Sequence, residues 1–525
     1  MSKLEHKPTE EQLEVLEALG GRDSVMVDAL AGCAKTTTLQ MGAPRIKVPA
    51  LALAFNKRNA DELKPKLPGN FTVKTFNGLG HQAVARALPR VSRLELDDRK
   101  LSKLITQVAK DRDLRLAGDQ WDQLRQLIRG AMQAGLVPGD LGDPMTPDTP
   151  EAWQAIADQA WIDQDTLDFL YDMAREILER NNLLTEQGVI SFDDQVYYSS
   201  CIAGQFIQYP QITVDESQDL NLLNHRQIAK SLRPDGRLAV VGDPLQAIYA
   251  FRGADAESMP KLRLLRPEAS WVSKPLKITF RCPKVIVARQ QDHAPGYRAW
   301  HTNAEGRVAR LGRPQAEELE PGWTWGDVQA ALPHSGARVM VLCRNNGPLF
   351  SLAFKLIRQR IGVVMLGRDI GKNLVTLSKK LLPEDSTDRF ACSAKVAAWI
   401  EEESSLARAN GHEERVASIT DRGECLLAVI DSGCRDAGEL RSMLQQLFAR
   451  DSGQVTLSSI HKAKGMEEEV ILHLDPWRIP SRYAIEAAKA GDPRQLQQEY
   501  NLKYVCETRS KHTLLEGNLK EFVEG

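Results

Sequence analysis

Two short segments far apart in the chain carry the residue types needed to hold and cleave a nucleoside triphosphate. Residues 29–36 (ALAGCAKT) follow an apolar run and have the order of a phosphate-binding loop between a strand and a helix. Backbone N–H groups of such a loop point at phosphates, and Lys35 would reach the β- and γ-phosphates. The expected phosphate-binding residues are Ala31, Gly32, Cys33, Ala34, Lys35, Thr36 and Thr37.

The second segment, residues 212–216 (ITVDE), lies about 180 residues later and is an apolar run that ends in paired carboxylates. Asp215 would hold Mg²⁺ through water, together with the hydroxyl of Thr36. Glu216 is placed to polarise an attacking water molecule as general base. The two segments together predict a site that hydrolyses ATP, with ATP and Mg²⁺ as the cofactors.

The loop departs from the general pattern at Ala34, which stands where most phosphate loops have glycine. A Cβ atom at this position restricts φ just before the lysine. An inactive loop is therefore an alternative to a phosphate site. A second Gly-Lys pair, in residues 367–372, is followed by Asn373 in place of the needed hydroxyl. We interpret that pair as the start of a helix.

The bulk composition is that of an ordinary globular protein with several domains: 525 residues, 42% hydrophobic and 26% charged. The net charge of −2 means that any nucleic-acid binding depends on a local basic channel. The eight cysteines form no CxxC pair, which argues against zinc and against a disulfide framework. Cys33 in the phosphate loop favours a reducing compartment. Because no apolar run is long enough to span a membrane, we expect a cytoplasmic protein with no membrane partner.

Short runs rich in Val, Ile and Leu recur along the chain, and several run into a helical pattern. This alternation is typical of parallel α/β sheets. The runs fall into two sets, which predict two sheets. The first set is 24–30, 50–56, 72–76, 211–215 and 237–242, and the second is 338–343, 362–366, 455–461 and 470–474. The stretches that interrupt the two sets read as mostly helical insertions.

Residues 240–254 (VVGDPLQAIYAFRGA) closely resemble the GDxxQxIYxFRGA motif of superfamily 1 DNA helicases of the UvrD/Rep/PcrA type. Other segments resemble motifs of the same family in the same order, over nearly the whole chain. They are 9–12 (TEEQ), 279–283 (TFRCP), 459–467 (SIHKAKGME) and 504–511 (YVCETRSK). The compact build is similar to that of phage-type or F-box-helicase-like members.

The resemblance implies an α/β fold with two RecA-like parallel-sheet P-loop NTPase domains, each carrying a mainly helical insertion. The first RecA-like domain would comprise residues 1–87 and 189–275, with residues 88–188 as its insertion. The second would comprise residues 276–372 and 454–525, with the smaller residues 373–453 as its insertion.

The resemblance also implies roles in the nucleotide site. Gln12 would read the adenine, Phe280 would stack on it, and Glu467 would contact the ribose. Two arginine fingers would reach the γ-phosphate, and a glutamine would sense it. The implied catalytic residues are Lys35, Glu216, Gln246, Arg281 and Arg509.

The implied partners are single-stranded DNA and single/double-strand junctions, and the protein partners are left unknown. Aromatic side chains stack on bases of any sequence, so stacking contacts can move along a strand. His461 would couple the DNA to the ATP site. The implied DNA-binding residues are Phe55, Asn56, Lys57, Thr75, Phe76, Tyr249, Phe251, Arg252 and His461.

Three functions remain open at this point. The first is a helicase that moves 3′ to 5′ on single-stranded DNA, as members with this motif set do. The second is a translocase that strips proteins from single-stranded DNA and unwinds weakly, because the second insertion is only about 80 residues long. The third is an ATP-gated DNA-binding module that does not cycle, which the alanine in the phosphate loop motivates.

Overall fold

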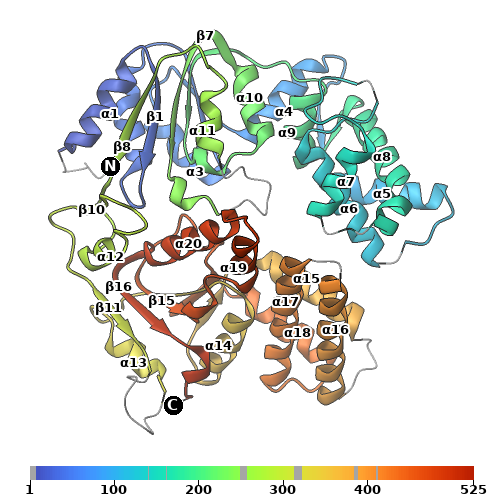
Figure 1. Cartoon of the computed structure of the whole chain (residues 1–525), viewed down its shortest axis with the longest axis vertical. Helices are drawn as coiled ribbons and strands as arrows, with labels where there is room; N and C mark the ends of the chain where they lie inside the picture. The colour runs from blue at the N-terminus through green and yellow to red at the C-terminus, as the bar shows by residue number, and fades with distance from the viewer. Residues whose placement is uncertain are drawn as a thin grey trace. The chain divides into compact units, whose positions relative to one another are not determined.

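The structure is a computed structural model that describes residues 7–116, 118–139, 141–160, 162, 164–248, 257–312, 322–382, 388–409 and 412–524. The chain divides into two compact units (Figure 1). The first unit contains Met1–Ala29 and Ala34–Leu276, and the second contains Leu30–Cys33 and Lys277–Gly525. Each unit has its own six-stranded sheet.

The first sheet is parallel throughout, in the strand order β3-β2-β6-β7-β1-β8. Its inner strands are almost continuously buried because helices cover both faces. The strands are β1 (Ser24–Ala29), β2 (Ala50–Ala54), β3 (Phe71–Thr75), β6 (Tyr209–Val214), β7 (Leu232–Gly242) and β8 (Trp271–Leu276). The helices that follow or flank them are α1 (Glu10–Gly20), α2 (Lys35–Gly42), α3 (Lys57–Leu63), α4 (Phe76–Ala87), α9 (Phe192–Cys201), α10 (Leu222–Ser231) and α11 (Ser258–Arg263).

Between β3 and β6 the chain forms a mainly helical segment with its own apolar core. Its helices are α5 (Lys100–Asp111), α6 (Gly118–Ala134), α7 (Pro150–Gln159) and α8 (Gln164–Glu186). A short ladder, β4 (Glu95–Leu96) with β5 (Val189–Ile190), joins the two ends of this segment. The apolar stripe of α8 runs from Leu170 to Leu178 and is fully buried.

The second sheet is also parallel, in the order β11-β16-β15-β12-β14-β13. Its strands are β11 (Arg307–Arg310), β12 (Val339–Cys343), β13 (Val363–Met365), β14 (Val455–Ser459), β15 (Glu468–Leu474) and β16 (Ser510–Gly517). A small ladder pairs β9 (Ile278–Thr279) with β10 (Arg298–Ala299). The helices of this unit are α12 (Lys284–Arg289), α13 (Trp325–Ala330), α14 (Gly347–Arg358), α19 (Arg482–Lys489) and α20 (Arg494–Glu507).

Four further helices lie between β13 and β14 and extend the core of the second unit. They are α15 (Arg368–Leu381), α16 (Arg389–Ala409), α17 (Glu413–Asp431) and α18 (Ala437–Ala449). The Gly-Lys pair in residues 367–372 begins α15, with Gly367 in a left-handed conformation before its first residue. Among the described residues, no helix is both long enough and apolar enough to cross a membrane.

The predicted fold class is confirmed, since both sheets are parallel and consist of six strands each. All nine apolar runs of the sequence correspond to strands. Within the two six-stranded sheets the sequence pattern missed β8, β11 and β16, and elsewhere it missed the short strands β4, β5, β9 and β10. The strand β8 lies at an edge of its sheet and contains Lys274 and Pro275, which a buried central strand excludes. The exact bounds of the two insertions stay predictions.

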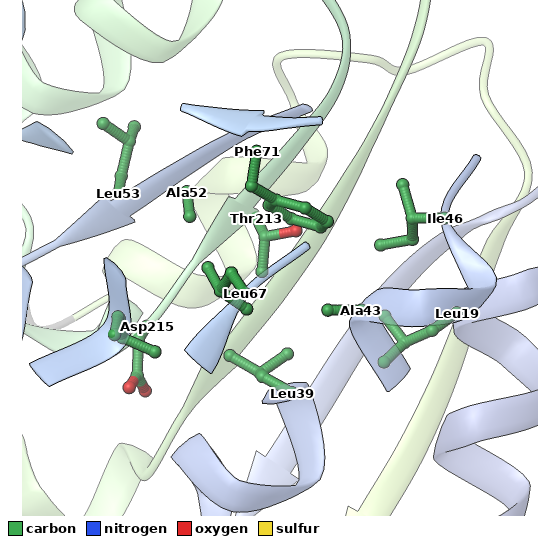
Figure 2. Close-up of a pocket in the computed structure, with 11 residues that line it drawn as sticks. Leu19, Leu39, Ala43, Ile46, Ala52, Leu53, Leu67, Phe71, Thr213 and Asp215 are labelled. Carbon is green, nitrogen blue, oxygen red and sulfur yellow. The ribbon is translucent and has the colours of Figure 1, made fainter. Parts of the chain in front are cut away.

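A small cavity lies in the core of the first unit, among α2, β2, β3 and the neighbouring turns (Figure 2). Its volume is about 10 Å³, which is room for about one water molecule. Leucine and alanine side chains line most of it. Thr213 and Asp215 contribute the polar atoms of the lining. The core behind the phosphate loop is therefore closely packed.

A buried ion pair anchors the helical segment of the first unit to α9. Lys100 Nζ lies 2.9 Å from Asp194 Oδ2, and both side chains are almost fully buried. The ammonium group also donates to the Asn181 carbonyl oxygen (2.8 Å) and the Thr185 hydroxyl (2.6 Å). Asp194 accepts further bonds from Asn181 and Ser191. Every donor of Lys100 is used, so the pair is stable in spite of its burial.

We expect Lys100→Met to lower the free energy of unfolding by roughly 3 to 5 kcal/mol, because it leaves the Asp194 charge buried without its cation. Equilibrium unfolding in urea measures the change. Arg58→Met is the matched control, since it removes the strongly exposed i,i+4 pair with Glu62 and should change stability little. Equal effects of the two substitutions would contradict the prediction.

Candidate ATP and DNA site

The predicted catalytic segments of the first unit meet at one edge of its sheet. The strands β6, β7 and β1 are adjacent and parallel, so their carboxyl ends lie side by side. Asp215 and Glu216 follow β6, Asp243 follows β7, and Lys35 begins α2 after β1. In open parallel sheets, ligands bind outside the carboxyl ends of the strands. The topology thus brings together residues that are about 180 positions apart.

Lys35 is surrounded by carboxylates. Its Nζ lies 3.3 Å from Glu216 Oε2. Burial acts to lower the pKa of Lys35, but the negative charges of Glu216, Asp243 and Asp215 outweigh it and raise the pKa. Lys35 is therefore a permanent cation at the position predicted for the phosphate-binding lysine.

Thr36 and Asp215, the two predicted magnesium ligands, are in direct contact. The Thr36 hydroxyl donates to Asp215 Oδ2 at 2.6 Å. Burial, and then the adjacent charge of Glu216, raise the pKa of Asp215 from 3.8 to about 6. Burial also raises the pKa of Asp243. Three carboxylates face one lysine, and this excess of negative charge and hard oxygen ligands fits a divalent cation such as Mg²⁺.

Ala34 adopts the backbone conformation that a glycine would supply. Its φ is 56° and its ψ is 40°, in the left-handed region, immediately before α2. Gly32 in the same loop also has a positive φ, of 70°. The left-handed region costs an alanine roughly 1 to 2 kcal/mol. The loop therefore has its expected shape in spite of the alanine. Contacts in the surrounding fold offset the conformational strain at Ala34.

Glu216 is held in place by its backbone and by a neighbouring amide. Its φ of 53° is unusual for a non-glycine residue and directs the chain into a short 3₁₀ turn. Gln218 Nε2 donates to Glu216 Oε2 at 2.7 Å, while Gln218 Oε1 accepts from the Asp243 N–H at 3.1 Å. Gln218 thus bridges the loops after β6 and β7. Sequence reasoning missed this role, although Gln218 lies within the same short acidic segment.

Gln246 and Gln12 are both engaged within the first unit. Gln246 Nε2 donates to Asp243 Oδ2 at 2.6 Å, next to the carboxylates that surround Lys35. Gln12 forms a capping box with Thr9 at the start of α1, and its Nε2 donates to the Thr38 hydroxyl at 3.0 Å. Gln12 therefore connects α1 to α2, the helix that begins with Lys35.

The predicted DNA contacts of the first unit follow β2 and β3, on the same edge of the sheet as the ATP residues. Phe55 is exposed, and Asn56 caps α3, which begins at Lys57. Thr75 caps α4 by accepting from the Gly78 N–H at 3.1 Å. Phe76 is buried in the core, so its ring is not available at the surface. Tyr249, Phe251 and Arg252 lie outside the described residues.

The two predicted arginine fingers lie together in the second unit. Arg281 forms an ion pair with Glu467, and its guanidinium also donates to the Thr508 carbonyl oxygen at 3.4 Å. Arg509 is buried and donates to the carbonyl oxygens of Val505 (2.9 Å) and Met466 (3.3 Å). Burial, and then the charge of Arg281, lower the pKa of Arg509 to about 10. Two guanidinium groups in such proximity attract an anion.

Glu467, the predicted ribose contact, forms two ion pairs in the second unit. Besides Arg281, it pairs with Lys511 at 2.9 Å. Burial acts to raise the pKa of Glu467, but Arg281 and Lys511 outweigh it and lower the pKa. The predicted adenine-stacking residue, Phe280, packs against Trp300 with 5.3 Å between the ring centroids.

The carboxyl ends of β14 and β15 in the second sheet are followed by residues that are able to contact a nucleic acid. His461 follows β14 and is half-buried. Trp477 follows β15, is 62% exposed, and stacks on the guanidinium of Arg478 at 4.9 Å. Single exposed aromatic residues are ordinary on protein surfaces, but a ring of this kind is able to stack on a base. Sequence reasoning missed Trp477, because a lone aromatic residue gives no signal until its exposure is known.

The raised pKa of Asp215 predicts a pH-dependent effect of Asp215→Asn on stability. Above about pH 6 the Asp215 carboxylate is ionised in both the native and the unfolded state. Because its pKa is higher in the native state, this ionisation lowers the free energy of unfolding. In the absence of divalent cations, we expect Asp215→Asn to stabilise the protein at pH 8 by up to roughly 3 kcal/mol. Near pH 4 the gain should almost disappear, because the carboxyl is largely protonated in the native state. Thermal unfolding of wild type and Asp215→Asn at the two pH values measures the difference in stability. A stability gain that does not change with pH would contradict the prediction.

Comparisons with known proteins agree with this geometry. Residues 9–264 match the UvrD/REP helicase N-terminal domain family. This range includes the phosphate loop, the carboxylates after β6 and the glutamine after β7.

Three relatives illustrate how far the similarity extends. The ATP-dependent DNA helicase UvrD2 of Mycobacterium tuberculosis is 24% identical over 62% of this chain and 50% of its own length. The F-box DNA helicase protein 1 of Schizosaccharomyces pombe is 22% identical over 97% of this chain and 57% of its own length. DNA helicase II of Escherichia coli is 25% identical over 50% of this chain and 36% of its own length.

The chain thus spans about half the length of the first two relatives. The resemblance indicated by the sequence motifs is confirmed: residues 9–264 match the UvrD/REP helicase N-terminal domain family, and the relatives named above are DNA helicases.

Proposed function

We propose that this protein is an ATP-dependent DNA helicase that moves 3′ to 5′ on single-stranded DNA. The observation that carries the proposal is the group around Lys35, in which a buried cation, a Thr36–Asp215 contact and Glu216 meet at one sheet edge. The names of the relatives, which are DNA helicases, support the same activity.

In this proposal Lys35 binds the β- and γ-phosphates, and Thr36 and Asp215 hold Mg²⁺. The metal would neutralise the phosphate oxygens as negative charge develops on them. Glu216 takes a proton from the attacking water, and Gln218 and Lys35 hold its carboxylate in place. Gln246, bonded to Asp243, is positioned beside this group to respond to the γ-phosphate.

Arg281 and Arg509 would stabilise the charge on the transferred phosphoryl group. Both are presented by the second unit, while Lys35 and Glu216 belong to the first. ATP would thus draw the two units together, and hydrolysis would release them. In the second unit, Arg281 is paired with Glu467, so ATP binding would exchange this carboxylate for a phosphate.

Single-stranded DNA would bind along the residues that follow β2 and β3 in the first unit and β14 and β15 in the second. The candidates of the first unit lie on the same edge as the ATP residues, so movement of one loop is passed to the next along the sheet. In the second unit, Arg509 precedes β16, whereas His461 and Trp477 follow β14 and β15. The loop of residues 460–467 connects the two edges covalently, from His461 to Glu467.

The stripping translocase remains the second candidate, favoured by the small size of the four-helix segment α15–α18. It would use the same ATP site as the helicase. The difference is that it would displace bound proteins and separate strands only weakly. The non-cycling module loses its main support, because Ala34 adopts the left-handed conformation that the loop requires.

We expect ATP hydrolysis to be strongly stimulated by single-stranded DNA. Glu216→Gln should lower kcat at least about a hundredfold, because it removes the general base while keeping the side chain's shape. Lys35→Ala should abolish hydrolysis by removing the phosphate-binding cation. Steady-state hydrolysis with and without single-stranded DNA measures both effects. A wild-type rate equal to that of Glu216→Gln would show that the site does not turn over.

Unwinding of tailed duplexes tests polarity and output. We expect a duplex with a 3′ single-stranded tail to be separated and one with a 5′ tail to remain intact. The reverse preference would overturn the polarity. Strong DNA-stimulated hydrolysis, clearance of a protein filament and little strand separation would instead support the stripping translocase. Glu216→Gln serves as the control in each assay.

A further inference from the structure

Glu507 is a fully buried carboxylate at the end of α20, two residues before Arg509. Its Oε2 accepts from Arg289 Nε at 2.9 Å and from Gln290 Nε2 at 2.5 Å. Burial raises the pKa of Glu507, and the charge of Arg289 opposes that rise. A buried carboxylate is costly unless it is paired, so its partners define what it does.

Both partners of Glu507 lie at the end of α12. Arg289 is the last residue of that helix, and Gln290 is its C-cap. The helix α12 begins at Lys284, three residues after Arg281. One carboxylate therefore ties the helix that follows Arg281 to the helix that precedes Arg509.

A second set of contacts joins the same two segments closer to the arginines. The Thr508 carbonyl oxygen accepts from the Arg281 guanidinium and from the Cys282 thiol, each at 3.4 Å. The Thr508 hydroxyl accepts from the Arg509 guanidinium at 3.2 Å. These bonds are long or involve sulfur, and they are weaker than the charged bonds of Glu507. The Glu507 contacts are thus the strongest described link between the two segments.

The other charged groups around Glu507 lie on β16 or on α20 itself. Arg289 also pairs with Glu516 on β16, which is partly exposed and lies on a strand rather than on α20. Lys503, one turn earlier on α20, lies 3.9 Å from Glu507 Oε1. Glu516 shares the arginine but does not connect the two helices.

We propose that Glu507 is a positioning residue for the two arginines. Through Arg289 and Gln290 it holds the ends of α12 and α20 at a constant separation, so that Arg281 and Arg509 reach the same terminal phosphate. The role rests on the proposed ATPase function. It predicts that loss of the Glu507 contacts weakens recognition of the γ-phosphate and leaves recognition of the rest of the nucleotide intact.

The test compares wild type, Glu507→Leu and Glu516→Gln in the full chain. Isothermal titration with ADP and with a non-hydrolysable ATP analogue measures binding, and DNA-stimulated hydrolysis gives kcat and KM. We expect Glu507→Leu to lower kcat by roughly ten- to a hundredfold through misplacement of the arginines. Its affinity for the ATP analogue should fall while its affinity for ADP stays within about twofold of wild type. Glu516→Gln should match wild type in both affinities and in kcat.

Two milder variants distinguish a positioning role from a folding defect. Gln290→Met removes one hydrogen bond to Glu507 and keeps the size of the side chain and the Arg289 pair. It should lower kcat and the affinity for the ATP analogue less than Glu507→Leu does. For both quantities, Glu507→Gln should lie between Glu507→Leu and wild type. Equal losses of ADP and ATP-analogue affinity in folded variants, or unchanged values in all of them, would overturn the role. Failure of the proposed function would be visible in wild type itself, as absence of hydrolysis.

Discussion

The buried charge of Lys35 is the constraint on which the first unit depends. A lysine inside a protein needs anions nearby, and three carboxylates from two loops supply them. Burial, and to a lesser extent the adjacent charge of Glu216, raises the pKa of both Asp215 and Asp243. In the proposed function, a divalent cation beside Asp215 would offset this negative charge, and a triphosphate would give Lys35 a further partner.

Because the strands of each sheet are parallel, the residues that follow them lie side by side along one edge of the sheet. Along the first sheet, the carboxyl ends of β3 and β2 present the candidate DNA contacts, and those of β6, β7 and β1 present the ATP residues. In the second unit Arg281 follows β9 and Arg509 precedes β16, while His461 and Trp477 follow β14 and β15. The loop of residues 460–467 connects the carboxyl end of β14 to the amino end of β15.

Several site residues lie where the motifs place them but make contacts that the motifs do not reveal. Phe76 has its ring in the core, and both ends of the Gln12 amide are bonded within the unit. Glu467 pairs with Arg281 and Lys511. A motif specifies residue type and order along the chain. The partner of a long polar side chain depends on which other groups the fold brings within about 3 Å, and that is not encoded locally.

The sequence by itself determined the two parallel sheets, the phosphate loop with its distant carboxylates, and the family resemblance, because apolar runs and motif spacing are local properties. It did not determine the edge strands β8 and β11, whose mixed composition reflects partial exposure, or the inner strand β16. Only the tertiary structure decided that Ala34 takes a left-handed conformation, that Trp477 is exposed and that Glu507 joins α12 to α20. Each of these depends on contacts between residues distant in the chain, and such contacts exist only after the sheets have formed and the helices have packed on them.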